Sequence, residues 1–254
     1  MAIDEAVATL HGRGVSPPTI RFYGWNPACL SIGYFQPIER EVEIEVCRAE
    51  GIDVVRRPTG GRAVLHDDEL TYSLIAMEQE PRIAGGVTES YRKISAGILA
   101  GLTRLSVVAD MAPGRGGQHD HLHSAACFDS ASSYEVTVGG KKLVGSAQVR
   151  RGGVVLQHGS LLLSFDSNKL LSLLKLTVSD RSNLKDELDK KVTSMASIAG
   201  WRQEFSDVAE ALRCGFEQAL AILLAVGPLT NEEEDLANKL LADKYTRSEW
   251  NFRR

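Results

Sequence analysis

Arginine, glycine and histidine residues occur together in one short stretch of the chain, RRPTGGRAVLHD. Its paired glycines can adopt backbone conformations that other residues resist, and they let a ligand approach the main chain closely. Backbone N–H groups at such a turn, together with Arg56, Arg57 and Arg62, could hold a phosphate or an acyl carbonyl. A tight turn between two strands, with its arginines in solvent, is the alternative. The stretch lacks the GxGxxG and Walker A patterns, so it does not indicate a standard nucleotide-binding loop.

A cysteine in a loop is the second candidate for chemistry. Cys127 follows a run rich in glycine and histidine, APGRGGQHDHLHSAA, and it precedes a strand-like segment. Nucleophiles are often found on loops that a rigid scaffold positions. A thiol has an ordinary pKa of about 8.5, so it needs a neighbouring cation or base to react readily near neutral pH. The alternative is a small buried side chain with no chemical role, which is what we expect for Cys29, Cys47 and Cys214.

Three histidines alternate in the run that precedes this cysteine. His119, His121 and His123 would share one face of a strand, and three imidazoles could bind zinc. The surrounding residues are typical of a solvated loop, however, so we predict no metal site.

A lysine and a further histidine lie in segments with the pattern of strands. SYEVTV, two glycines and KKLVGSAQV predict a hairpin with a two-residue turn, in which Thr137 faces Lys142. Lys142 and Val144 are then expected on the face opposite Val136, where the lysine is either a charge at the rim or a cation that faces a cleft. His158, in the next strand-like run VVLQHGS, presents the same two alternatives.

The elements that must position these side chains follow from hydrophobic periodicity. Short strands with short connections indicate antiparallel pairing, and the helices would cover the sheet. We therefore predict an α+β, or mixed α/β, fold with one central, largely antiparallel sheet flanked by helices. Predicted helices cover 2–11, 39–51, 88–105 with Thr88 as its cap, 205–223, and a last helix opened by a Thr230–Glu233 capping box with Leu241 inward. Predicted strands cover 19–25, 30–35, 52–57, 70–77, the hairpin at 133–149, and 154–165.

Composition restricts the class of protein. A chain of 254 residues is long enough for one large domain, and its net charge of −4 gives no general indication of nucleic acid binding. The four cysteines form no close pair, so we expect neither disulfides nor a CxxC zinc site. The N-terminus does not resemble a signal peptide, and the longest apolar run, ALAILLAV, is too short to span a bilayer. We expect a soluble cytoplasmic protein with neither nucleic acid nor membrane as a partner.

Three segments, in this order, resemble one known family. RRPTGGRAVLHDDELTYSLI, SAACFDSASSYEVTVGGKKLVGSAQVRRGGVVLQHGSLLL and KYTRSEWNFRR are similar to the lipoate–protein ligase and octanoyltransferase superfamily, and most similar to its cysteine-dependent octanoyltransferases. The resemblance implies the fold of the biotin/lipoate protein ligase catalytic domain, which is class II synthetase-like. It implies a single domain over 1–254, with 204–254 forming helices packed on it. Family members usually carry a further strand before MAIDEA, so one sheet edge is expected to be missing.

The resemblance also implies a reaction in two steps. An octanoyl group moves from acyl carrier protein to an enzyme cysteine, and then to a lysine of a lipoyl domain, typically the glycine-cleavage H protein. Cys127 in ACFD matches the nucleophile, and Lys142 in KLVGSAQ matches the lysine of the superfamily. As an ammonium, Lys142 would favour the thiolate and stabilise an oxyanion, whereas a neutral Lys142 could take a proton from the incoming amine. No cofactor is implied.

Two walls around the acyl group are further implied by the resemblance. The first wall is the glycine loop, and the second is formed by the hairpin and the strand that follows it. The first-wall residues are Arg56, Arg57, Thr59, Gly60, Gly61, Arg62 and His66, and the second-wall residues are Gly145, Ser146, Gln148, His158 and Gly159.

Three other functions remain open. An ATP-dependent lipoate ligase would form an acyl-adenylate with Mg²⁺ and need no cysteine; this chain has GGRAV where ligases often show a third glycine, and it lacks an obvious accessory domain. An amidotransferase would move octanoyl from one lipoyl domain to another. A catalytically idle relative would only bind lipoyl domains, and the presence of Cys127 and Lys142 argues against it.

Overall fold

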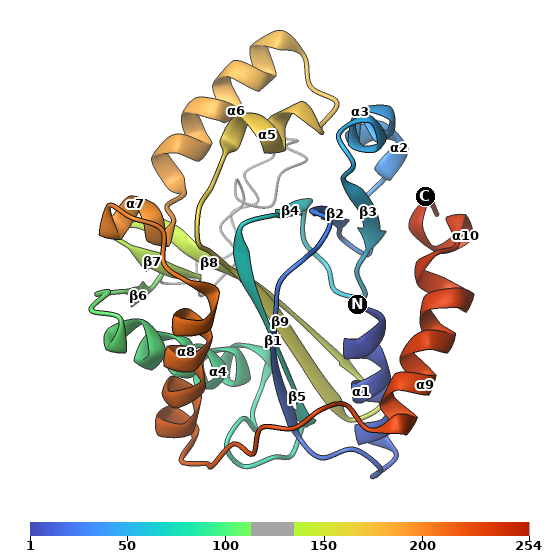
Figure 1. Cartoon of the computed structure of the whole chain (residues 1–254), viewed down its shortest axis with the longest axis vertical. Helices are drawn as coiled ribbons and strands as arrows, with labels where there is room; N and C mark the ends of the chain where they lie inside the picture. The colour runs from blue at the N-terminus through green and yellow to red at the C-terminus, as the bar shows by residue number, and fades with distance from the viewer. Residues whose placement is uncertain (113–134, 254) are drawn as a thin grey trace.

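The larger of two sheets forms the centre of the molecule. The structure is a computed structural model, and it describes residues 1–112 and 135–253. Every neighbouring pair of strands in the six-stranded sheet is antiparallel, as predicted (Figure 1). In their order across the sheet, these strands are β1 (Thr19–Tyr23), β5 (Glu69–Met77), β9 (Val154–Leu162), β8 (Lys141–Arg151), β7 (Val136–Val138) and β6 (Asp110–Met111).

A smaller sheet lies over part of the larger one and carries the glycine loop. Its central strand β2 pairs in parallel with β3 and antiparallel with β4. The loop RRPTGGRA connects the ends of the two outer strands. The three strands are β2 (Cys29–Ile32), β3 (Asp53–Arg56) and β4 (Val64–His66).

Helices surround the two sheets, which confirms the α+β class. α9 packs against α1, and α5 packs against α6 (Figure 1). Within the described residues, no helix has the length and apolar character required to cross a membrane. The helices are α1 (Ala2–Gly12), α2 (Ile38–Glu41), α3 (Ile44–Ala49), α4 (Val87–Arg104), α5 (Ser167–Ser172), α6 (Val178–Lys191), α7 (Met195–Ala199), α8 (Phe205–Leu220), α9 (Asn231–Leu240), the π-helical turn η1 (Leu241–Tyr245) and α10 (Ser248–Asn251).

One face of the larger sheet packs against α4 and α8. These two helices approach each other closely because glycines line their contact: a Cβ on Gly215 would lie 2.3 Å from the backbone nitrogen of Gly101. The opposite face of the sheet meets α1 and the smaller sheet. The buried apolar residues on the helical face include Leu70, Tyr72, Leu74, Ile94, Ile98, Leu212 and Phe216.

The predicted hairpin is present, but its register changes the expectation for Val144. Gly139 and Gly140 have φ values of +57° and +78°, which explains why glycine occupies both turn positions. Thr137 faces Lys142 as predicted. An irregularity then follows between Val136 and Thr137, so that Val136 faces Val144. The prediction that Val136 and Val144 lie on opposite faces is therefore wrong, because a bulge leaves one extra residue, Leu143, in β8.

Several predicted helix ends differ from the observed ones. The helix predicted at 39–51 is interrupted at Val42, which is extended and bridges to Leu174, so two short helices form instead. Gly86, not Thr88, is the N-cap of α4, and no side chain caps it. α8 ends at Leu220, and Leu223 beyond it is 95% exposed.

The last predicted helix is correct at its start and wrong at its end. Thr230 and Glu233 form the expected capping box at the beginning of α9. Leu241 is 48% exposed, although it was expected to point inward. The buried side chains of α9 are those of Glu233 and Ala237. The side of α9 that packs against α1 is therefore centred on Glu233 and Ala237 and not on its leucines.

Candidate functional site

Arg56 at the end of β3 is a buried structural residue next to the glycine loop. The side chain is fully buried, and its guanidinium donates to the carbonyl oxygens of Gly33 at 2.8 Å and Asn251 at 3.0 Å. Further donations reach the carbonyl oxygens of Trp250 and Arg253. Arg56 thus ties the loop after β2 to the C-terminal helix α10. The alternative that the loop arginines are solvated is wrong for this residue.

Arg57 holds the glycine loop in its shape. Its guanidinium donates to the carbonyl oxygens of Gly60 at 3.0 Å and Arg62 at 2.6 Å within the loop. It also donates to the carbonyl oxygen of Ser31 on β2 at 3.1 Å. Because this side chain is buried as well, a solvated arginine is excluded here too. Both arginines act as internal supports of the first wall.

The glycine loop lies close to the backbone at the end of β2. Gly61 has a φ of +101°, which side chains rarely adopt. A Cβ on Gly33 would lie 1.9 Å from the carbonyl oxygen of Gly61, so no larger residue fits at position 33 without displacing the loop. The loop is therefore packed onto the end of β2 backbone to backbone.

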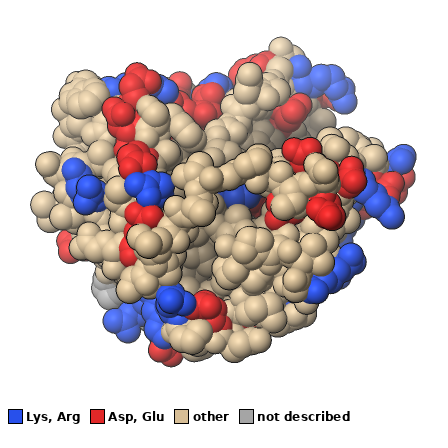
Figure 2. Space-filling model, turned by 60° about the horizontal axis from the view of Figure 1, so that its bottom comes forward, with Lys and Arg blue, Asp and Glu red and all other residues tan. Residues whose placement is uncertain are grey.

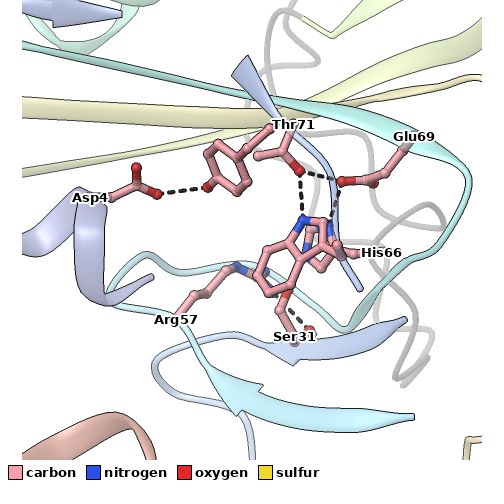
Figure 3. Close-up of polar contacts among 8 residues, drawn as sticks. Asp4, Ser31, Arg57, His66, Glu69 and Thr71 are labelled. Atoms are coloured by element: carbon pink, nitrogen blue, oxygen red, sulfur yellow. Dashed lines mark hydrogen bonds and ion pairs between the residues drawn. The ribbon is translucent and has the colours of Figure 1, made fainter. Parts of the chain in front are cut away.

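His66 lies at the centre of a buried polar cluster (Figure 3). Its Nδ1 is 2.8 Å from Oε1 of Glu69, and its Nε2 is 2.8 Å from Oγ of Ser31. The ring stacks on Trp25, with centroids 4.4 Å apart and an interplanar angle of 18°. Thr71 accepts a hydrogen bond from Nε1 of Trp25 and donates one to Glu69. Every polar atom of the imidazole is thereby held in place.

One oxygen in this cluster has no donor among the described residues. Oε2 of Glu69 is buried without a hydrogen-bond partner, and so is Oγ of Ser160 on the neighbouring strand. Glu69, Thr71 and Ser160 share one face of the larger sheet, because Thr71 and Ser160 are direct partners in the register. Leaving buried polar atoms unsatisfied costs free energy, so such atoms are often found where a ligand binds.

His158 joins the first wall to the larger sheet. Its Nε2 lies 2.7 Å from Oγ1 of Thr59 in the glycine loop. Burial lowers the pKa of His158 to about 3, although the negative charge of Asp4 opposes this shift. The imidazole is therefore neutral near pH 7, and it can offer a hydrogen bond without carrying a charge.

The second-wall residues separate into two groups. Gly145 pairs with Ser160, which places it on the face of His158. Ser146, in contrast, accepts a hydrogen bond from Tyr72 at 2.8 Å on the face covered by α4. The structure thus brings Gly145 and His158 toward the glycine loop, whereas the side chain of Ser146 points to the helices.

Gln148 and Gly159 also face α4. Nε2 of Gln148 donates to Oε1 of Gln157 at 2.9 Å and to Ser90 of α4 at 3.2 Å. A Cβ on Gly159 would lie 2.6 Å from the ring of Tyr72. These two residues shape the sheet beneath α4, on the face that points away from the glycine loop.

Lys142 is buried and makes an ion pair within the sheet. Its Nζ lies 2.5 Å from Oε1 of Glu135, and the two side chains are 5% and 8% exposed. The alternative of a charge at the rim is therefore wrong. The predicted nucleophile Cys127 lies outside the described residues, as do His119, His121 and His123.

Two of the other cysteines are packing residues, as expected. Cys29 and Cys47 are buried. Burial raises the pKa of Cys29 to about 12 and that of Cys47 to about 11, so both thiols are protonated near neutral pH. Cys214 is half-buried on α8. In the part of the chain that the structure describes, no group of three His, Cys, Asp or Glu residues is arranged to hold a metal ion.

The surface on one side of the molecule carries charges of both signs. When the bottom of Figure 1 is turned forward, the Lys and Arg side chains drawn there are interspersed with Asp and Glu (Figure 2). A surface of this kind differs from the basic face that is typical of nucleic acid binding.

Sequence comparisons place this architecture in one family. The family model described as the lipoyl protein ligase A/B catalytic domain matches residues 1–217, and this chain belongs to that family. An octanoyltransferase LipM of Kyrpidia tusciae is 50% identical over 259 residues, covering 100% of this chain and 94% of that protein. The octanoyltransferase LipM of Bacillus subtilis is 43% identical, with 100% and 93% covered.

Solved structures of ligases share the fold. A lipoate-protein ligase A bound with ATP has a TM-score of 0.79 at 29% identity, over 99% of this chain and 92% of that one. A bipartite lipoate protein ligase of Thermoplasma acidophilum has a TM-score of 0.80 at 28% identity, over 99% and 89%. The fold prediction is thereby confirmed.

Proposed function

We propose that this protein is an octanoyltransferase of lipoate biosynthesis. The observation that carries the proposal is the identity of 50% and 46% to proteins named octanoyltransferase LipM, each over the whole of this chain. The solved ligases are 28–29% identical, so they support the fold more than the activity. An octanoyltransferase requires an acyl donor and a lipoyl-domain acceptor. We propose octanoyl–acyl carrier protein as the donor and glycine-cleavage H protein as the acceptor, in the cytoplasm.

The first chemical step is an exchange of thioesters. The thiolate of Cys127 attacks the carbonyl carbon of the octanoyl thioester, and the bond from that carbon to the carrier sulfur breaks. The carrier leaves as a thiolate, which takes up the proton that the Cys127 thiol had lost. One thioester replaces another, so the step is nearly balanced in energy and needs no ATP. Lys142, as a cation, would stabilise the thiolate and the oxyanion that forms during the attack.

The second step forms an amide. The neutral amine of the acceptor lysine attacks the Cys127 thioester, the carbon–sulfur bond breaks, and a proton passes from the amine to the sulfur. This step is downhill because an amide is more stable than a thioester. The buried position of Lys142 supports its assignment to this chemistry, because a catalytic cation is more effective away from water.

The observed contacts refine the proposed walls of the acyl site. His158, Thr59 and His66 present hydrogen-bonding groups between the two sheets, with Gly145 on the same face. Arg56 and Arg57 contribute by holding the loop, since their guanidinium groups donate to backbone carbonyls. Gly60, Gly61 and Arg62 supply loop backbone. Ser146, Gln148 and Gly159 would act through the shape of the sheet beneath α4.

Intact-protein mass spectrometry tests the proposal. The protein is incubated with octanoyl–acyl carrier protein without ATP, and we expect one octanoyl adduct that hydroxylamine removes and that is absent from Cys127→Ser. Addition of H protein should discharge the adduct and transfer its mass to the acceptor.

Two other results would contradict the proposal. A protein that forms no adduct, and that modifies lipoyl domains only with ATP and free acid, is a ligase. A protein that accepts octanoyl only from an octanoylated lipoyl domain is an amidotransferase. Supplying each donor separately distinguishes these outcomes.

A further inference from the structure

The partner of Lys142 is a residue to which the sequence patterns gave no role. Glu135 immediately precedes β7, and its Oε1 lies 2.5 Å from Nζ of Lys142 on β8. Both side chains are almost completely buried, at 8% and 5% exposure. A lysine and a glutamate are rarely buried to this degree unless they are paired.

The backbone on both sides of the pair is fixed. The carbonyl oxygen of Glu135 accepts a hydrogen bond from the amide of Ala112 at 2.8 Å, next to β6. The carbonyl oxygen of Lys142 accepts one from the amide of Thr193 at 2.9 Å, before α7. The register shift lies between Val136 and Thr137, and its extra residue on β8 is Leu143, which directly follows Lys142. Bulges of this kind often redirect a side chain next to a functional site.

Stability alone does not explain such a pair. Removing two charges from water costs several kcal/mol per ion in real proteins, and the attraction between them often does no more than offset this cost. A well-packed apolar pair of similar volume would be about as stable. The buried pair is therefore better explained by a functional need for a lysine ammonium group with a fixed orientation.

We propose that Glu135 is a positioning residue for Lys142. Its carboxylate fixes the direction of the Lys142 ammonium, so that the cation is ready to meet the negative charge that develops on the acyl group. This inference rests on the proposed function, because it assumes that Lys142 takes part in acyl transfer. In this role Glu135 acts through Lys142.

A double-mutant cycle tests the inference. The four proteins are the wild type, Glu135→Gln, Lys142→Met and the double variant, and the rate of octanoyl-adduct formation is followed by intact mass. We expect Glu135→Gln to slow the wild-type reaction by about 10–100-fold, because small displacements of a catalytic group have effects of this size. In the Lys142→Met background the same substitution should change the rate by less than about twofold.

The controls separate a positioning role from a structural one. Lys141→Met removes the exposed neighbouring lysine on the same strand and should leave the rate unchanged. Glu135→Asp keeps the carboxylate and should recover part of the rate lost in Glu135→Gln. If Glu135→Gln does not fold, Glu135→Asp takes its place in the cycle. It should then slow adduct formation in the wild-type background by a smaller factor, and it should not change the rate in the Lys142→Met background.

Two results would overturn the inference. An unchanged rate in Glu135→Gln shows that Lys142 needs no carboxylate. An equal loss in both backgrounds shows that Glu135 acts on the structure and not through Lys142. Failure of the proposed function is recognised separately, because the wild type would then form no adduct with octanoyl–acyl carrier protein.

Discussion

Oγ1 of Thr59 lies 2.7 Å from Nε2 of His158, and this contact joins the glycine loop to the larger sheet. The two residues are 99 positions apart, so the loop is fixed by a strand from the second half of the chain. Because the imidazole is buried, its protonation would break or rearrange the contact. The contact between the two walls of the candidate site therefore depends on His158 being neutral.

This dependence predicts a loss of stability in acid. The pKa of His158 is lowered to about 3 in the folded protein, whereas an unfolded histidine titrates near about 6.5. Between these values the unfolded state binds the proton and the folded state does not, so the free energy of unfolding falls as the pH falls. The contribution of His158 is up to about 1.4 kcal/mol per pH unit.

Urea unfolding of the wild type and His158→Gln at about pH 6 and about pH 4 measures this contribution. Glutamine at position 158 keeps a polar group but has no proton to gain. The free energy of unfolding should decrease more steeply in the wild type than in the variant. Equal slopes would show that His158 titrates normally in the folded protein.

A second prediction concerns the internal support of the loop. Arg56→Met removes donors to the buried carbonyl oxygens of Gly33 and Asn251 and leaves both acceptors without these hydrogen bonds. We expect the free energy of unfolding to decrease by about 3 kcal/mol. Hydrogen exchange should also become faster at 248–253, which Arg56 holds.

The matched control is an arginine in solvent. Arg48 pairs with Glu45 on the surface, and the two side chains are 71% and 82% exposed. Arg48→Met should change stability by no more than about 0.5 kcal/mol. A comparable loss of unfolding free energy in both variants would mean that the buried contacts of Arg56 stabilise the fold no more than a surface ion pair does.

A third prediction compares two glycines. Gly33→Ala places a methyl group 1.9 Å from the carbonyl oxygen of Gly61, so the loop must move. Gly60→Ala meets nothing within 4 Å, and its backbone has no positive φ. Thermal unfolding should show a large decrease in Tm for Gly33→Ala and little change for Gly60→Ala. The reverse order would contradict the observed approach of the loop to β2.

A fourth prediction separates two roles of Lys142. Arginine keeps a positive charge but does not lose a proton in proteins. If Lys142 takes the proton from the acceptor amine, Lys142→Arg should form the acyl-enzyme and fail to transfer the group to H protein. Both steps can be followed by intact mass. Normal transfer by this variant would exclude proton transfer by Lys142 and leave the electrostatic role.

The sequence predicted most elements and their class, because hydrophobic periodicity is a local property. The hairpin at Gly139-Gly140 and the capping box at Thr230 were correct, since both depend on residues within a few positions. The bulge in the pairing of β7 with β8 was not predictable in this way. It depends on how β7 pairs with both β6 and β8, and no local pattern marks it.

The candidate site was predicted as a set of residues and not as a set of roles. Arg56 and Arg57 were expected beside a ligand, yet both donate to carbonyl oxygens, several of them from distant parts of the chain. Trp25, Ser31 and Glu69 were missed because their contacts with His66 exist only after β2, β4 and β5 assemble. The spacing of His66 and Glu69, three positions apart, is the one local signal that could have indicated the pair.

The contacts of Arg56 have a consequence for the order in which the protein folds. One guanidinium connects carbonyl groups 20–23 residues earlier with others 194–197 residues later. Contacts over such separations form late, because the intervening chain must first become compact. The wall around the glycine loop is therefore completed only when distant parts of the polypeptide have come together. Substitutions or truncation in the segment at 250–253 should consequently alter the conformation of the loop after β2, although the two segments are far apart along the chain.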